Sequence, residues 1–246
     1  MPGYYTILNF LGHRIRSRKW DSFHSPYLFR LLTDCCNEKI TFPVFERIES
    51  KRKEFFDSSK RISRMDYGAG MISGLKGSNQ KISTIANRSI SLPYQCRFLY
   101  RLVNMLKPHT MIEFGTCLGI SSAYLAMGAT GGKLITIEGD TALAEEAEKI
   151  FESLEIKNIV PINSTFENFI ENELKATGPL DFVFLDGNHK SAALIKYYQA
   201  LKPHFNPNTI VVVDDIYWSS DMYKGWNSLV AMPEVRQSVD CFQFGL

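Results

Sequence analysis

Short apolar runs alternate with longer amphipathic stretches over residues 91–246. The runs are TMIEF (110–114), KLITIE (133–138), NIVPI (158–162), DFVFLD (181–186) and TIVVVDD (209–215). A helix-like stretch separates each run from the next, as TALAEEAEKIFESL (141–154) does after the second. Short buried strands joined by helices are typical of βαβ units, whose parallel sheet is covered on both faces. The pattern therefore predicts an α/β fold with a mostly parallel sheet.

The first part of the chain, residues 1–90, has a different pattern. Helices are expected over about 26–36, where Ser25 and Pro26 form a start signal, and over 43–56, which begins at a proline. Charged stretches separate them, and no buried strand is indicated. We therefore expect an N-terminal helical extension or cap over 1–90 and one α/β domain over 91–246. The 246 residues are enough for one sizeable core.

Two glycine-rich stretches compete as the cofactor loop, 66-DYGAGMISG-74 and 113-EFGTCLGIS-121. Such a loop works when a strand leads into a tight turn and the free N–H groups of a following helix point at the ligand. The second stretch follows TMIEF, and Ser121 with Ser122 is expected to cap the helix after it. The first follows the charged segment KRISRM, which is not strand-like. We therefore assign the cofactor to 113–121.

The acidic residues near this loop indicate the kind of cofactor. The pattern E-x-G-x-x-x-G-x-S lacks the third glycine of the dinucleotide fingerprint, which disfavours a nicotinamide cofactor. Glu113, just before the glycines, suits a ligand with a positive charge or an amino group and no pyrophosphate. Glu138 ends the next strand, where a carboxylate usually accepts both hydroxyl protons of a ribose.

Composition narrows the possible partners and location. The net charge of +2 gives no support to a nucleic-acid or membrane partner. The five cysteines are scattered without a CxxC spacing, which favours reduced thiols in a cytosolic protein and no zinc site. The N-terminus reverses the charge order of a secretory signal, and no apolar run reaches eighteen residues. We expect a cytoplasmic protein.

Four blocks identify a family resemblance: MIEFGTCLGISSAYLA, LITIEGD, DFVFLDGNHKSAA and VVVDDIYW. In this order, over about 93–230, they resemble the class I S-adenosylmethionine-dependent methyltransferases, and among these the catechol and macrolide/sugar O-methyltransferase-like groups. The resemblance implies a Rossmann-like doubly wound sheet of about seven strands and S-adenosyl-L-methionine as cofactor. It does not specify the methyl acceptor.

The resemblance also implies which residues contact the cofactor: Glu113, Gly115, Thr116, Gly119, Ser121, Glu138, Ser164, Thr165, Phe166 and Asp186. The glycine loop would line the methionine part, with Glu113 beneath it and Ser121 binding its carboxylate. Glu138 would hold the ribose, and residues 164–166 would contact the adenine. For Ser164 and Thr165 the alternative is a simple N-cap of the following helix.

A metal site is implied at the ends of the fourth and fifth strands. Asp186, Asp214 and Asp215 collect there, and catechol-type enzymes hold a divalent metal with acids in these places. Oxygen ligands suit Mg²⁺, Mn²⁺ or Ca²⁺. The sequence departs from that family pattern, because Asp215 stands where asparagine is usual and His189 replaces a lysine. The alternative is that Asp214 or Asp215 only caps the next turn.

His189 is the candidate general base, with Asp186 in the same turn as the second catalytic residue. Methyl transfer to oxygen requires the hydroxyl proton to leave, and histidine accepts protons near neutral pH. A helix-capping or orienting histidine is the alternative. Trp218 and Trp226 could wall the acceptor pocket or form a hydrophobic flap.

Two segments remain outside this scheme. Residues 66–70, DYGAG, could form a lid over the site, with a plain structural turn as the alternative. VRQSVDCFQFGL (235–246) resembles the start of an antiparallel hairpin, so the last strand is either truncated or supplied in another way. An exposed sheet edge of that kind favours a homodimer.

The leading function is a small-molecule O-methyltransferase. A non-catalytic S-adenosylmethionine-binding module is compatible with every cofactor residue, and a nicotinamide-dependent oxidoreductase is disfavoured by the missing glycine. Nucleic acid is disfavoured as the acceptor because no N/D-P-P-Y/F motif follows the fourth strand.

Overall fold

The computed structural model describes residues 10–15, 17, 25–64 and 78–246. The candidate lid at residues 66–70 lies outside the described residues. No helix in the described part is long and apolar enough to cross a membrane.

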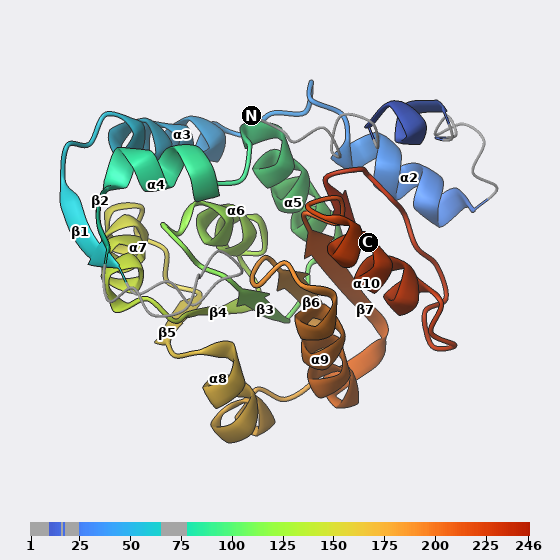
Figure 1. Ribbon diagram of the computed structural model, residues 1–246. Coiled ribbons are helices and arrows are strands. Elements are labelled where there is room, and N and C mark those ends of the chain that lie inside the picture. The colour runs from blue at the N-terminus through green and yellow to red at the C-terminus, as the bar shows by residue number, and fades with distance from the viewer. Residues whose placement is uncertain (1–9, 16, 18–24, 65–77) are drawn as a thin grey trace.

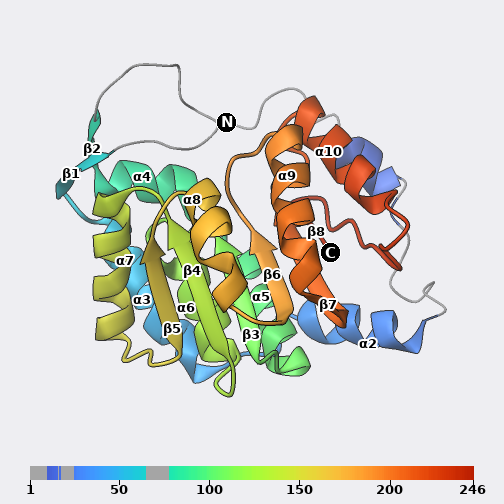
Figure 2. The same cartoon turned by 90° about the horizontal axis from the view of Figure 1, so that it is seen from below.

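A six-stranded sheet forms the centre of the described structure, in the order β5-β4-β3-β6-β7-β8 (Figure 1; β8 is labelled in Figure 2). The strands are β3 (Thr110–Phe114), β4 (Lys133–Glu138), β5 (Ile159–Asn163), β6 (Leu180–Leu185), β7 (Phe205–Asp214) and β8 (Phe244–Gly245). The first five are parallel, and β8 runs antiparallel to β7. The predicted α/β fold with a mostly parallel, Rossmann-like sheet is confirmed, with six described strands instead of about seven.

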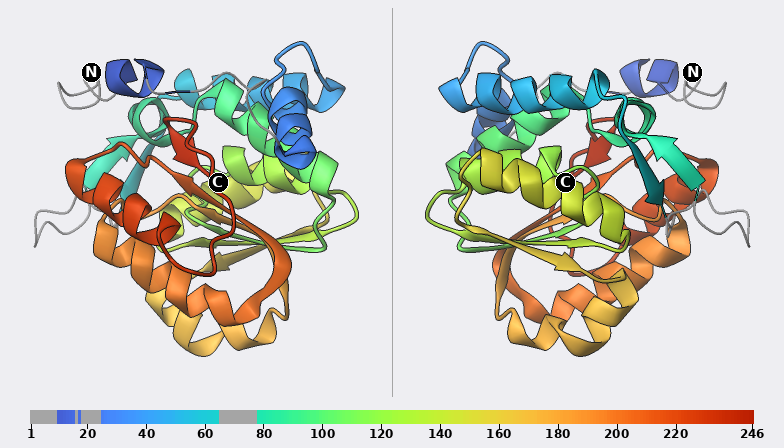
Figure 3. Two further views of the ribbon diagram at one scale, coloured as in Figure 1. Left: turned by 90° about the vertical axis from the view of Figure 1, so that its right-hand side faces the viewer. Right: turned by 90° about the vertical axis from the view of Figure 1, so that its left-hand side faces the viewer.

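Helices cover both faces of the sheet (Figure 3). One layer contains α5 (Pro93–Leu106), α6 (Ile120–Gly128) and α7 (Thr141–Ser153), and the other contains α8 (Phe166–Asn172), α9 (Ser191–Leu201) and α10 (Ser220–Val230). Met111 and Phe182 pack into the core on the α5–α6 side, whereas Ile112 and Val183 pack into the core on the α9–α10 side. Burial on both faces explains why these strands are continuous apolar runs.

The N-terminal helices pack on the layer formed by α5, α6 and α7. They are α2 (Pro26–Cys35), α3 (Pro43–Phe56) and α4 (Ile82–Ser89). Phe45 and Ile48 of α3 share one apolar cluster with Tyr124 of α6. The Tyr124 hydroxyl donates to Glu49 at 2.8 Å, and the buried Arg52 donates to the Ser91 carbonyl at 2.6 Å. These bonds tie the predicted helices to the sheet domain.

A short antiparallel pair, β1 (Arg61–Arg64) with β2 (Ser78–Lys81), was not expected. The prediction that nothing strand-like precedes residue 66 is wrong. Ile62 is the only apolar residue of β1 and is 8% exposed, so a single buried side chain distinguishes this strand from a charged loop. Two-stranded ribbons with one buried residue give almost no periodic signal.

The parallel strands all run toward one edge of the sheet, as β4, β5 and β6 show in Figure 2. The C-terminal segment forms the predicted antiparallel hairpin in short form, with bridges from Gly245 to Asp240 and to Val213. Among the described residues, β8 pairs with only Val213 and Asp214 on the outer edge of β7. Two short 3₁₀ turns, Leu174–Ala176 and Lys202–His204, complete the connections.

Candidate functional site

A cavity of about 610 Å³ lies at the carboxyl ends of β3, β4, β6 and β7. Its walls come from the loop after each of these strands, from the first turn of α5 and from the end of β1. Open α/β sheets bind their ligands in the crevice at this edge. Some of the site residues that the sequence predicts line the walls of this cavity, and others lie beneath the walls.

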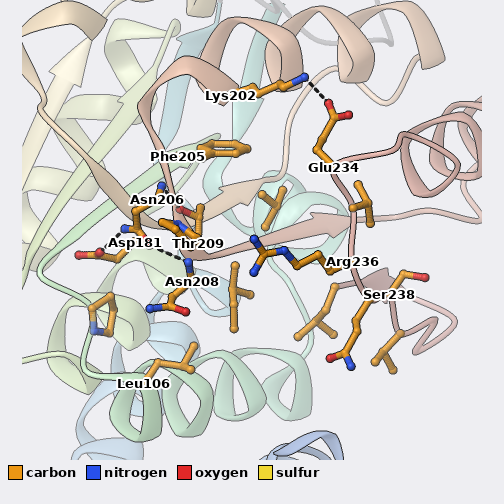
Figure 4. A pocket seen from close by; sticks show the side chains of 18 of the residues that line it. Leu106, Asp181, Lys202, Phe205, Asn206, Asn208, Thr209, Glu234, Arg236 and Ser238 are labelled. Carbon is orange, nitrogen blue, oxygen red and sulfur yellow. Dashed lines mark hydrogen bonds and ion pairs between the residues drawn. The ribbon is translucent and has the colours of Figure 1, made fainter. Parts of the chain in front are cut away.

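A larger cavity of about 1000 Å³ lies elsewhere, beside β7 (Figure 4). Asp181 and Asn206, at the amino ends of β6 and β7, line it together with Arg236 of the C-terminal segment. It contains none of the predicted site residues, and Trp226 faces it instead of the smaller cavity. We therefore place the candidate site in the smaller cavity, which Trp218 lines.

The glycine loop after β3 lies in close contact with the loop after β6 and with the end of β4. Gly115 has φ +112°, and a Cβ there would lie 2.1 Å from the Asp186 carbonyl oxygen, so the position requires glycine. The N–H groups of Gly115 and Thr116 donate to the Ile137 carbonyl at 3.0 and 3.2 Å. These bonds hold the loop across the end of β4, against the loop that follows β6.

Beneath this loop, Glu113 is fully buried in a network of hydroxyl groups. Ser121 and Thr136 donate to its carboxylate at 2.7 Å each, and Ser122 also donates to it. Burial raises the pKa of Glu113, and the three hydroxyl donors oppose that rise. Thr116 bonds Thr136 at 2.6 Å and so joins the same network. Glu113, Thr116 and Ser121 therefore support the loop from below, outside the cavity wall.

The expected serine cap of the following helix is not formed. Helix α6 begins at Ile120, and Gly119 with φ +79° is its N-cap residue. Ser121 and Ser122 lie inside the first turn, where both hydroxyls point to Glu113. The buried carboxylate accepts the protons of both serine hydroxyls, and hydrogen bonds to an ionisable group are stronger than the bond that a capping serine accepts from a helix N–H.

Glu138, in contrast, lines the cavity with an oriented carboxylate. The N–H of Cys117 donates to Oε2 at 2.8 Å, and the N–H of Asp140 donates to Oε1 at 2.9 Å. Burial raises the pKa of Glu138, while these two donors and the charge of Arg64 lower it. Each oxygen keeps a further acceptor position. The group is therefore fixed and still able to accept two hydroxyl protons.

The segment after β5 combines helix capping with a cavity wall. The Thr165 hydroxyl accepts from the Asn168 N–H at 3.2 Å and caps α8, while the Ser164 hydroxyl accepts from the Asn168 side chain at 2.7 Å. Thr165 and Phe166 line the cavity, and Ser164 does not. The Phe166 ring stacks on Phe114 at 4.8 Å. The cavity thus receives a fixed aromatic wall here.

Three carboxylates meet at the other end of the cavity, as the parallel topology predicts. Burial raises the pKa of Asp186 well above its ordinary value, and the charges of Asp214 and Asp215 add to the rise. Burial and the charge of Asp215 raise the pKa of Asp214 to about 8. The Gln95 amide donates to Asp214 over a long 3.5 Å, and the carboxyl group of Asp186 also hydrogen-bonds Asp214. Near neutral pH, at least one carboxyl group in this cluster therefore holds a proton.

Metal binding by this cluster remains a prediction. In the described part of the chain, no three His, Cys, Asp or Glu side chains are arranged to hold a metal ion. The all-oxygen donor set of Asp186, Asp214 and Asp215 nevertheless matches the chemistry of a hard divalent cation.

His189 lies beside the acid cluster. Its Nε2 is 3.7 Å from a carboxylate oxygen of Asp215, which is longer than a hydrogen bond, and its ring is 5.4 Å from the Trp218 ring. Burial lowers the pKa of His189, and the charge of Asp215 opposes the change. The imidazole is therefore neutral at pH 7. Asn188, which precedes His189, and Asp215 both have positive φ, +53° and +51°. The backbone is therefore locally strained next to His189 and at Asp215.

Sequence reasoning missed the residues that the N-terminal elements bring to the cavity. In the first turn of α5, Tyr94 lies near the acid cluster, because burial and the charges of Asp214 and Asp215 raise its pKa to about 12. The same turn supplies Gln95, which accepts from the Leu92 N–H at 2.7 Å. The end of β1 supplies Arg64. No motif marks these positions, because only tertiary packing brings them to the strand ends.

Comparison with known proteins finds similarity to methyltransferases. A family model described as a methyltransferase domain matches residues 112–216. A catechol O-methyltransferase of Niastella koreensis is 28% identical over 127 residues, which cover 50% of this chain and 57% of that protein. The match thus spans little more than half of that relative.

Two solved structures share the fold over most of the chain. An SAH-bound methyltransferase of Podospora anserina superposes with a TM-score of 0.61 at 15% identity, over 93% of this chain and 96% of that one. An O-methyltransferase from Bacillus cereus in complex with SAH gives a TM-score of 0.58 at 18% identity, over 85% of this chain and 87% of that one.

Proposed function

Because this chain belongs, through residues 112–216, to the class I S-adenosylmethionine-dependent methyltransferases, we propose that it methylates a hydroxyl group of a small molecule. One observation supports this most directly. Glu138, a fixed hydrogen-bond acceptor, lines one end of a single cavity, and the neutral imidazole of His189, beside an acid cluster, lines the other. The similarity to a catechol O-methyltransferase supports oxygen as the accepting atom.

The residues of the cavity fit S-adenosylmethionine in size and chemistry. A cavity of about 610 Å³ has the volume of an ordinary ligand pocket. Glu138 offers acceptors for the two ribose hydroxyls, and the Phe166 ring offers an apolar wall for the adenine. When bound, the cofactor supplies a methyl group on a positively charged sulfur.

His189 is the proposed general base. As the acceptor oxygen bonds to the methyl carbon and the carbon–sulfur bond breaks, the hydroxyl proton must leave, and the imidazole accepts it. Neutrality at pH 7 is what this role requires, and burial provides it. The carboxylate of Asp215, 3.7 Å away, stabilises the imidazolium that forms. Asp186 belongs to the same turn and is proposed as the second catalytic residue, beside His189.

Asp186, Asp214 and Asp215 are proposed to hold Mg²⁺, Mn²⁺ or Ca²⁺ if a metal takes part. A divalent cation would neutralise carboxylates whose pKa values are raised by burial and by mutual repulsion. Turnover measured with added Mg²⁺ and with a chelator decides whether the metal is used.

Calorimetric titration of S-adenosylhomocysteine (SAH), the demethylated product, tests the proposal first. We expect a Kd in the micromolar range and no binding of NADH, which the oxidoreductase alternative requires. A panel of hydroxyl compounds incubated with S-adenosylmethionine should then yield methylated product and SAH, both measured by mass spectrometry. Folded protein that binds no SAH would contradict the proposal, and binding without turnover of any acceptor would favour a non-catalytic binding module.

A further inference from the structure

We propose that Arg64 binds the carboxylate of the cofactor's methionine part; this inference rests on the proposed function. Arg64 ends β1, outside the methyltransferase domain match, and its side chain lines the same cavity as Cys117 and Glu138. The N-terminal cap would thus supply part of the cofactor site.

The serine expected to bind this carboxylate is already engaged. A serine hydroxyl has one proton to donate. The proton of Ser121 goes to Glu113 at 2.7 Å, and the residue is 7% exposed and does not line the cavity. A cofactor carboxylate near Ser121 would also approach the buried acid Glu113. The donor for the cofactor carboxylate must therefore come from another part of the wall.

Arg64 is held in place by one edge of its guanidinium. Its Nε lies 3.3 Å from Oδ2 of Asp140, and the side chains are 16% and 4% exposed. Asp140 is fixed in turn, because its other oxygen accepts the Ala142 N–H at 2.9 Å as the N-cap of α7. Within the described residues, no contact is recorded for the two terminal nitrogens, Nη1 and Nη2. These two groups form the fork that matches a carboxylate.

The charges along the cavity favour the same position. The described wall contains five acids, Glu138, Glu167, Asp186, Asp214 and Asp215, and two arginines, Arg64 and Arg88. An anionic group is therefore repelled along most of the wall. The methionine carboxylate is the cofactor's only anionic group, so it needs one of the two arginines.

Arg64 is the better placed of the two arginines. Its charge lowers the pKa of both Glu138 and Cys117, which puts it at the cofactor end beside the glycine loop. Arg88 is exposed in the last turn of α4. Because Arg64 is largely buried and already oriented by Asp140, it loses less side-chain freedom when it binds.

The test compares two ligands that differ only in the carboxylate: SAH and its decarboxylated analogue, which keeps the adenosine and the amine. Calorimetry gives the Kd of each ligand for wild type and for Arg64→Gln. We expect Arg64→Gln to weaken SAH binding about 10- to 100-fold, as for other charged hydrogen bonds, and to change the analogue less than about threefold. Arg64→Lys, which keeps the charge and loses the fork, should fall between wild type and Arg64→Gln for SAH.

Two control variants match the charge change. Arg61→Gln alters an exposed arginine of the same strand that bonds Asn79, and Arg88→Gln alters the other arginine of the wall. Both should bind SAH nearly as wild type does. Equal weakening of both ligands by Arg64→Gln would mean that Arg64 acts only through Asp140 and the β1–β2 pair, and would overturn the proposal.

An unchanged SAH affinity in Arg64→Gln, or a carboxylate-specific loss in Arg88→Gln instead, would overturn it too. These outcomes differ from failure of the proposed function, in which wild type itself binds no SAH. Thermal unfolding of each variant shows whether a loss of affinity comes from a loss of fold.

Discussion

The buried carboxylates at the two ends of the cavity differ in their hydrogen bonding. At the β3–β4 end, Glu113 accepts from three hydroxyls and Glu138 from two backbone N–H groups. At the β6–β7 end, Asp186 and Asp214 share a hydrogen bond between carboxyl groups, the Gln95 amide lies 3.5 Å from Asp214, and Asp215 faces His189 at 3.7 Å. The first end is hydrogen-bonded before any ligand arrives. The second keeps carboxylates that a proton or a bound group would stabilise.

This difference assigns separate roles to the two ends. Satisfied carboxylates in fixed positions are suited to binding, because little reorganises when the ligand enters. Carboxylates with raised pKa values beside a neutral histidine are suited to chemistry, because small changes move protons and charge. Substitutions at the first end should therefore change affinity for the cofactor, and substitutions at the second should change turnover or pH dependence.

The largest expected effect is on turnover, at the β6–β7 end of the cavity. His189→Asn should lower kcat about 10²- to 10⁴-fold, the usual contribution of a general base. The Kd for SAH should change less than about threefold, because the proposed cofactor contacts lie at the other end. In wild type, burial lowers the pKa of His189, so the acid limb of the kcat–pH profile should have its midpoint below the ordinary histidine value of about 6.5.

His204→Asn is the matched control, since His204 lies in a 3₁₀ turn away from this cavity. It should leave kcat and its pH profile unchanged. Full turnover in the His189 variant would show that His189 is not the general base. A loss of SAH affinity as large as the loss of kcat would show that the two ends do not have separate roles.

The next effect is at the binding end. Glu138→Ala should weaken SAH binding about 10- to 100-fold, because it removes the acceptor proposed for two ribose hydroxyls. Calorimetry at fixed pH measures this change. Glu167→Gln is the control, because Glu167 of α8 also lines the cavity but accepts from the Tyr197 hydroxyl of α9 at 2.9 Å. Equal effects of both variants would indicate that the loss follows from net charge, with no specific role for Glu138.

The sequence was most informative where burial covers both faces of an element. The bounds of β3 and β4 were predicted to the residue, because their apolar runs face a core on each side. The gathering of Asp186 with Asp214 and Asp215 followed from parallel topology alone, since carboxyl ends of parallel strands share one edge.

It was least informative where a side chain reaches the cavity from another layer. Arg64 and Gln95 come from β1 and α5, and neither has a local pattern that points to the strand ends. The start of α6 was misplaced for a related reason. Its serines bond Glu113, a partner set by the packing of the helix on β3, which propensity does not encode.

The smallest expected effect concerns stability at the acceptor end. Asp214→Asn removes a carboxyl group whose pKa is raised to about 8 by burial and by Asp215. The folded protein keeps this proton across a pH range in which the unfolded chain, with an ordinary carboxyl pKa near 4, has released it. Wild-type stability therefore falls as pH rises from about 4 to about 8. The variant escapes this loss, so its Tm at pH 8 should exceed that of wild type by roughly 3–8 °C.

The gain should shrink steadily toward pH 4, where the wild-type carboxyl group is protonated in the fold and neutral like the amide. Thermal unfolding in the presence of a chelator, at several pH values, measures it. Asp181→Asn should change Tm in the opposite direction. The N–H groups of His109 and Thr110 lower the pKa of Asp181, so the stability that its carboxylate contributes is lost as pH falls. This variant should therefore be less stable than wild type at pH 8. If Asp214→Asn also lowered Tm at pH 8, the acceptor-end carboxylates would be as well satisfied as Glu138, and the contrast between the two ends would not hold.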